Sequence, residues 1–152
     1  MNDVRHEPEF LEVDMALSSR TDLGEIKISD QIIEDMITDI FSAPDMRNKI
    51  WAPSKYSYKI GNLHGITDPG SGLELESSRD EEGKVKIEFS VIVRFGISIR
   101  KTTREFSDKL YESMKYQLGI EPDVIIINIA GVKSKQIARR NTRVIYKYDN
   151  EE

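Results

Sequence analysis

Two stretches of the chain repeat their apolar residues with the 3.6-residue period of an α-helix. Each stretch follows a serine, Ser29 or Ser98, whose hydroxyl can accept a hydrogen bond from an amide of the first helical turn. Pro44 ends the first stretch by about Ser42, and Gly119 suits the left-handed position after the second. The positions that keep the period are Ile32, Ile33, Met36, Ile37, Ile40 and Phe41 in the first predicted helix, and Ile99, Thr103, Phe106, Leu110, Met114 and Leu118 in the second.

Between and after these helices the pattern is that of β-strands. Residues 85–93 alternate apolar and polar side chains, with one isoleucine as the exception, so one face of this strand is expected to be buried. The preceding segment, 71–78, is predicted to pair with it through an acidic turn in which Gly83 supplies a positive φ. Residues 124–129 are apolar on both faces apart from one asparagine, as in an interior strand. Shorter strands are expected at 23–28, 56–61 and 144–148.

The succession of strand, long helix and strand between residues 84 and 132 sets the fold class. Such a unit forms a right-handed crossover that leaves its two strands parallel. The sequence therefore predicts an α+β protein, with a small mixed β-sheet that contains a hairpin and a β-α-β crossover, and with two main helices packed on it. Three parts are expected along the chain: an acidic flexible N-terminal arm (1–22), the α+β domain (23–132) and a basic C-terminal segment with an acidic end (133–152).

Composition narrows the class of protein further. The 152 residues are 38% hydrophobic and 32% charged, which supports one domain with a modest core and a heavily solvated surface. No run approaches the ~18 apolar residues that a spanning helix needs, and the first ten residues lack the apolar region of a secretory signal. The chain has no cysteine, which excludes disulfides, thiolate metal sites and cysteine catalysis. A cytoplasmic location is expected.

No catalytic, metal-binding or cofactor-binding set can be assembled from the sequence. Neither of the two histidines, His6 and His64, has carboxylates at metal-ligand spacing. The glycines between positions 61 and 72 are not followed by the lysine–serine pair of a phosphate-binding loop. Residues 80–82 are three acids on one predicted turn, whereas paired catalytic carboxylates face each other across a cleft. We therefore expect a scaffold or binding module, with no catalytic residue, no metal, no cofactor and no small-molecule substrate.

The net charge of −5 is unevenly distributed along the chain. Residues 1–25 hold seven acids against two arginines, whereas residues 133–147 hold no acid. This basic segment is either a solvated stretch that offsets the acidic arm or a site for an anionic partner, namely an acidic protein, an anionic lipid surface or nucleic acid. Its candidate binding residues are Lys133, Lys135, Arg139, Arg140 and Arg143.

A second candidate lies in the irregular segment 43–72. Trp51, Tyr56 and Tyr58 alternate there with lysines, and this interleaving has three interpretations. The aromatic side chains can form the lid of the core, can stack on nucleic-acid bases, or can be the hot spot of a protein interface.

The order of these elements resembles that of the alkaline shock protein family, the envelope stress response proteins of Gram-positive bacteria. The family has Gly-x-Ile-x-Ile-Ser before its first helix, and residues 24–29 here read Gly-Glu-Ile-Lys-Ile-Ser. Its hydrophobic strand ends in an aromatic–glycine pair, as at residues 95–96. Its last strand follows a glycine–hydrophobic turn, as at residues 119–120, and holds an asparagine among apolar residues, here Asn128. The resemblance covers roughly residues 23–132.

The resemblance implies a non-catalytic function in envelope homeostasis and in alkaline or general stress. Family members are abundant cytoplasmic proteins, and some are held near the membrane by a small integral membrane partner. The implied function is thus a scaffold that binds protein partners at the inner face of the cytoplasmic membrane and self-associates into a homo-oligomer. The alternative is a nucleic-acid-binding module that uses the basic segment 133–152, which the moderate overall charge disfavours.

Overall fold

The computed structural model describes residues 17–21, 24–53, 73–134 and 137–148, with the backbone path alone for 17–21 and 24–27. Its elements alternate between strands and helices along the chain. In order, they are β1 (Leu17–Thr21), β2 (Gly24–Ile28), α2 (Asp30–Phe41), β3 (Ile50–Trp51), β4 (Glu76–Arg79), β5 (Val85–Arg94), α3 (Ile99–Leu118), β6 (Val124–Lys133) and β7 (Ile137–Lys147).

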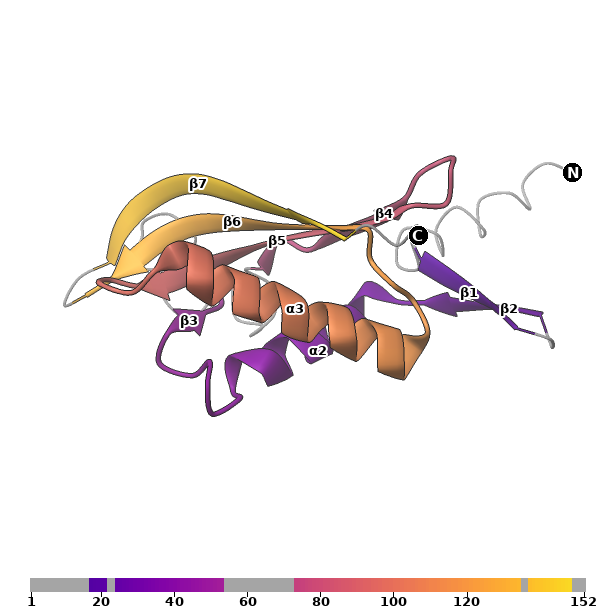
Figure 1. Cartoon of the computed structure of the whole chain (residues 1–152), viewed down its shortest axis with the longest axis horizontal. Coiled ribbons are helices and arrows are strands. Elements are labelled where there is room, and N and C mark those ends of the chain that lie inside the picture. The colour runs from indigo at the N-terminus through magenta and orange to yellow at the C-terminus, as the bar shows by residue number, and fades with distance from the viewer. Residues whose placement is uncertain (1–16, 22–23, 54–72, 135–136, 149–152) are drawn as a thin grey trace, which may run out of the picture.

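The main sheet has five strands in the order β3-β5-β6-β7, with β4 also paired to β5. Strands β5 and β6 are parallel and are joined by α3, and the other pairs are antiparallel. Strands β1 and β2 form a separate hairpin, which projects from one end of the molecule (Figure 1). Both helices lie on the same side of the main sheet. The predicted α+β class, the hairpin and the crossover are therefore confirmed.

The core lies between β5, β6 and the two helices. The five alternating apolar residues of β5, from Val85 to Val93, are all at most 2% exposed, so the helices cover the whole inner face of this strand. Phe106 of α3 is the centre of the packing, since its ring lies 5.1 Å from that of Phe41 in α2 and 5.6 Å from that of Phe89 in β5. Fully buried aromatic rings of this kind make the dominant contribution to core stability.

The helix ends match the sequence at three of the four predicted positions. The hydroxyl of Ser98 accepts a hydrogen bond from the Lys101 amide at 3.0 Å, and Gly119 has a φ of 71° at the C-terminal end of α3. Helix α2 ends at Phe41, as expected ahead of the proline. The prediction for Ser29 is wrong in one respect: the residue stands at the N-cap, but its hydroxyl makes no capping hydrogen bond.

Two segments are more ordered than the sequence pattern indicated. Residues 17–21, which were assigned to the arm, form strand β1. The C-terminal strand was expected at 144–148, but β7 begins at Ile137 and pairs with β6 along its length. The predicted strand at 56–61 lies outside the described residues.

Tyrosine hydroxyl groups join the end of β7 to α3. The Tyr146 hydroxyl lies 2.6 Å from Oγ1 of Thr103, and the Tyr148 hydroxyl lies 2.6 Å from Oγ of Ser107 and donates to Asp108 at 2.7 Å. Burial, followed by the hydrogen bond to Asp108, raises the pKa of Tyr148 to about 12. The Tyr148 hydroxyl therefore stays protonated, and keeps its hydrogen bond to Asp108, at any pH well below that value.

Candidate interaction surfaces

Strands β5 and β6 finish, and α3 and β7 begin, at one end of the molecule (Figure 1), and the segments at this end are rich in basic residues. The backbone brings distant segments together there: the Arg94 amide donates to the Lys49 carbonyl at 2.8 Å, and the Phe95 amide donates to the Lys133 carbonyl at 2.7 Å. Among the described residues 46–52, 92–101, 131–134 and 137–141 there is no acid. We call the eight basic residues of these segments the basic end: Arg47, Lys49, Arg94, Arg100, Lys101, Lys133, Arg139 and Arg140.

Two aromatic side chains belong to this end. The Lys133 ammonium lies 5.2 Å from the centroid of the Trp51 ring, in the range of a cation–π contact. The structure therefore brings together a predicted basic residue and a predicted aromatic residue that are 82 positions apart in the sequence. Phe95 is 69% exposed at the loop between β5 and α3, which is unusual for so large an apolar side chain.

The remaining predicted binding residues divide into two groups. Arg139 and Arg140 lie in the first half of β7, with Arg139 opposite Gly131, and belong to the basic end. Arg143 lies farther along β7, and its guanidinium is 3.4 Å from the Glu88 carboxylate, which also accepts a hydrogen bond from Asn128 at 2.9 Å. Arg143 thus takes part in a cross-strand polar cluster on the sheet face opposite the helices. Lys135, Tyr56 and Tyr58 lie outside the described residues.

The sequence analysis did not group Arg47, Lys49, Arg94, Phe95 or the first turn of α3 with the basic segment. The pairing of β3 with β5 and the parallel crossover bring them to the same end. The sequence offered one signal for this grouping, the aromatic–glycine pair at residues 95–96 that ends the buried strand. The ends of neighbouring parallel strands lie at the same edge of a sheet, so this pair marks the edge to which the basic segment also leads.

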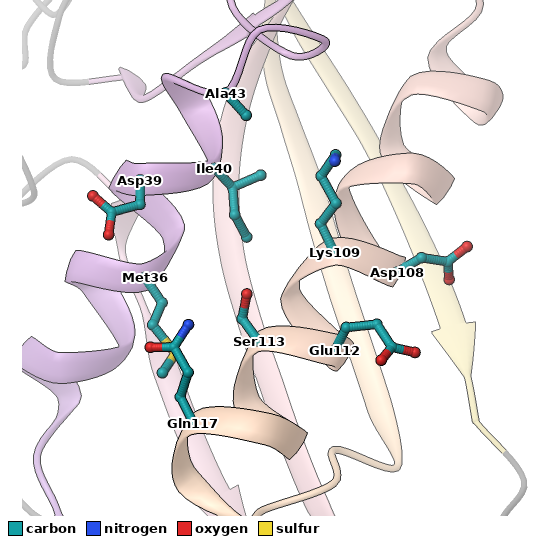
Figure 2. Close-up of a pocket in the computed structure, with 9 residues that line it drawn as sticks. All are labelled: Met36, Asp39, Ile40, Ala43, Asp108, Lys109, Glu112, Ser113 and Gln117. Carbon is teal, nitrogen blue, oxygen red and sulfur yellow. The ribbon is translucent and has the colours of Figure 1, made fainter.

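A groove of about 520 Å³ separates α2 from α3 on the helical side of the molecule (Figure 2). Met36 and Ile40 line it from α2, Ala43 lines it from the turn after α2, and Ser113 and Gln117 line it from α3. Met36 and Ile40 are only 7% and 6% exposed, so the floor of the groove exposes little apolar surface. Polar side chains form the walls above this floor.

Acidic side chains predominate along the edges of this groove. Asp39 lies on the α2 edge with its carboxylate directed away from α3, and Asp108 and Glu112 lie on the α3 edge with their carboxylates directed away from α2 (Figure 2). Lys109 is the one basic lining residue, and its ammonium is 2.9 Å from the carboxylate of Asp45. This contact holds the pKa of Asp45 below its usual range and neutralises Lys109. Negative charge therefore lies on the outer rims of the groove, on both sides of its apolar floor.

The described residues contain no group of three or more histidines, cysteines or acids that could hold a metal ion. No helix in the described part of the chain is long and apolar enough to cross a membrane. The three adjacent acids of the β4–β5 turn are exposed, and Asp80 accepts hydrogen bonds from the amides of Glu82 and Lys84, both at 2.9 Å. These acids therefore organise a turn.

Among the comparisons with known proteins, one family model matches the chain. Residues 18–134 match the model of the alkaline shock protein 23 family, which is described as having a cell envelope-related function. No curated protein and no solved structure matches the chain. The match covers all the elements from β2 to β6, including the crossover and both helices. The chain belongs to the alkaline shock protein 23 family, and its function is related to the cell envelope.

Proposed function

We propose that this protein is a non-catalytic scaffold of the envelope stress response, held at the inner face of the cytoplasmic membrane by a protein partner. The observation that carries the proposal is the acidic groove between α2 and α3. We propose that its occupant is a basic amphipathic segment from the cytoplasmic part of a small integral membrane protein.

The shape and the charge of the groove both support this occupant. Packing of a helix into a groove needs a row of apolar contacts, which Met36 and Ile40 of α2 and Ala43 of the turn after it offer. The floor exposes little apolar surface, so charge must supply much of the affinity for the partner segment. Cytoplasmic segments next to membrane spans are enriched in lysine and arginine. Such a segment meets Asp39 on one edge of the groove and Glu112 on the other.

Photocrosslinking in cells that make the full-length protein tests the proposal directly. A photoreactive amino acid replaces Ser113, which lines the groove, or Glu81, which is exposed on the β4–β5 turn. The Ser113 position is expected to crosslink to an integral membrane protein with a basic cytoplasmic segment, and the Glu81 position is not. A synthetic peptide of that segment should then bind the purified protein.

Charge reversal measures the contribution of the groove edges. The double variant Asp39→Lys, Glu112→Lys is expected to lose at least tenfold in affinity for the peptide, since removal of close opposite charges at an interface costs ~1–2 kcal/mol or more. The control is Glu81→Lys, Glu82→Lys, which makes the same charge change on the exposed β4–β5 turn. Equal affinities for the two double variants would contradict a partner site in the groove.

Self-association is the competing use of the same groove. The basic end of a second copy also complements the acidic edges, and such a head-to-tail contact would join copies into open chains. Sedimentation velocity distinguishes the two cases. Chains that dissociate in Asp39→Lys, Glu112→Lys, together with crosslinks from Ser113 to the same protein, would assign the groove to a second copy instead.

A further inference from the structure

We propose that the basic end binds anionic phospholipid headgroups directly, with Phe95 entering the membrane interface. This inference rests on the proposed location of the protein beside the membrane. It concerns a different surface from the groove, because the basic end lies where β5 and β6 finish, whereas the groove lies between the two helices. The two surfaces can therefore be tested separately.

Charge at the basic end is concentrated and has one sign. The eight lysines and arginines come from four elements, β5, α3, β6 and β7, and from the segment between α2 and β3, and the described segments that supply them hold no acid. Each basic side chain close to an anionic leaflet strengthens binding roughly fivefold, and the effects accumulate when the charges lie within one screening length of the surface. The N-terminal end of α3 adds the positive pole of a 20-residue helix at the same place.

Phe95 gives this surface its apolar contact. Its side chain is 69% exposed, and it sits between Arg94 and Gly96, whose φ is 91°. A left-handed glycine directly after the phenylalanine turns the chain sharply, so Phe95 lies at the turn by which the chain leaves β5. An exposed aromatic side chain at such a turn, with basic residues in the neighbouring segments, suits the boundary between headgroups and acyl chains.

These observations favour a lipid surface over a nucleic acid. The cations are spread over the ends of several elements, whereas a protein that binds a single strand arranges them along a groove that follows the phosphate backbone. The chain also belongs to a family with a cell envelope-related function. Nucleic-acid binding is accordingly the competing outcome of the experiment.

Vesicle binding by the purified full-length protein, without any partner, tests the inference. The vesicles contain phosphatidylglycerol and phosphatidylcholine, or phosphatidylcholine alone. Trp51 is the only tryptophan of the chain and lies at the basic end, so its emission reports on contact with the membrane. We expect binding to the anionic vesicles only, a steep loss of binding with salt, and quenching of Trp51 by brominated lipid.

Two pairs of variants make the test specific. Arg47→Glu, Lys101→Glu at the basic end should weaken binding more than 25-fold, at roughly fivefold per lost charge. The control Lys86→Glu, Lys147→Glu makes the same charge change beside Val124, at the other end of β6. Ten residues of strand span ~33 Å, well beyond the ~10 Å screening length, so the control should bind almost normally.

The second pair separates the apolar contact from charge. Phe95→Ala should weaken binding about tenfold, as loss of a buried phenyl ring does. Tyr116→Ala removes an aromatic side chain that is 76% exposed elsewhere and should have no effect. Equal binding by both members of either pair would overturn the inference. So would a preference for single-stranded RNA of random sequence over anionic vesicles at the same salt concentration.

The groove variant Asp39→Lys, Glu112→Lys keeps the two proposals apart. It should lose its protein partner and still bind anionic vesicles, because its changes lie outside the basic end. Conversely, Arg47→Glu, Lys101→Glu should still bind the partner peptide. Loss of vesicle binding by the groove variant would contradict the assignment of lipid contact to the basic end.

Discussion

Replacement of Phe106 by alanine tests whether one aromatic side chain holds the two helices on the sheet. Phe106 is fully buried and contacts the rings of Phe41 and Phe89. Loss of a buried phenyl group together with the cavity that remains costs ~3–5 kcal/mol. The two aromatic ring pairs contribute ~0.5–1.5 kcal/mol each to this cost. We therefore expect a loss of ~4 kcal/mol in the free energy of unfolding.

Urea denaturation followed by circular dichroism measures this loss, and thermal unfolding checks it. For a domain of this size a loss of ~4 kcal/mol lowers Tm by roughly 8–16 °C. Phe95→Ala is the matched control, because the same atoms are removed from a side chain that is 69% exposed. The control should change stability by no more than ~0.5 kcal/mol. If Phe106→Ala and Phe95→Ala had equal stabilities, the assigned centre of the core would be refuted.

Three further predictions concern the helix ends and the tyrosines. Ser98→Ala should cost ~1 kcal/mol in urea denaturation because its hydroxyl caps α3, whereas Ser29→Ala should cost almost nothing because it makes no such bond; equal costs would contradict this difference. Gly119→Ala should cost ~1 kcal/mol, since φ is 71° there, and an unchanged urea midpoint would count against a left-handed C-terminal cap. The raised pKa of Tyr148 means that stability is fully present below pH ~10 and is lost as the pH rises toward about 12. In Tyr148→Phe, the free energy of unfolding measured against pH should fall less steeply between pH ~10 and about 12. An unchanged slope would show that another group causes the loss.

The sequence predicted the elements whose side chains meet the core. The helical period and the alternation in β5 both reflect burial, and the buried residues Phe106, Leu110 and Val91 lie where those patterns placed them. The first half of β7 gave no such signal. Residues 138–141 are all exposed, so their side chains carry no hydrophobic period. Backbone pairing of Ala138 and Arg139 with β6 places this part of β7 in the sheet.

The candidate surfaces were predicted in part, for a related reason. Lys133 and Arg139 are close in sequence, and their basic segment is visible as a run without acids. Arg94 joins them through the parallel pairing of β5 with β6, in which it is opposite Lys133, and Arg47 joins them through the pairing of β3 with β5. Short-range sequence patterns do not encode either pairing. The groove is likewise formed by the outer sides of two helices, where polar residues obey no strict period.

Strand β7 has a consequence for the limits of the folding unit. The family match stops at residue 134, but a chain cut there would lose the outermost strand of the sheet. The new edge would be β6, whose Ile125, Ile126 and Ile127 are at most 4% exposed in the intact molecule. An edge strand that is apolar on both faces recruits other chains and aggregates. The segment that matches the family model is thus shorter than the segment that must be expressed to avoid aggregation, which includes β7.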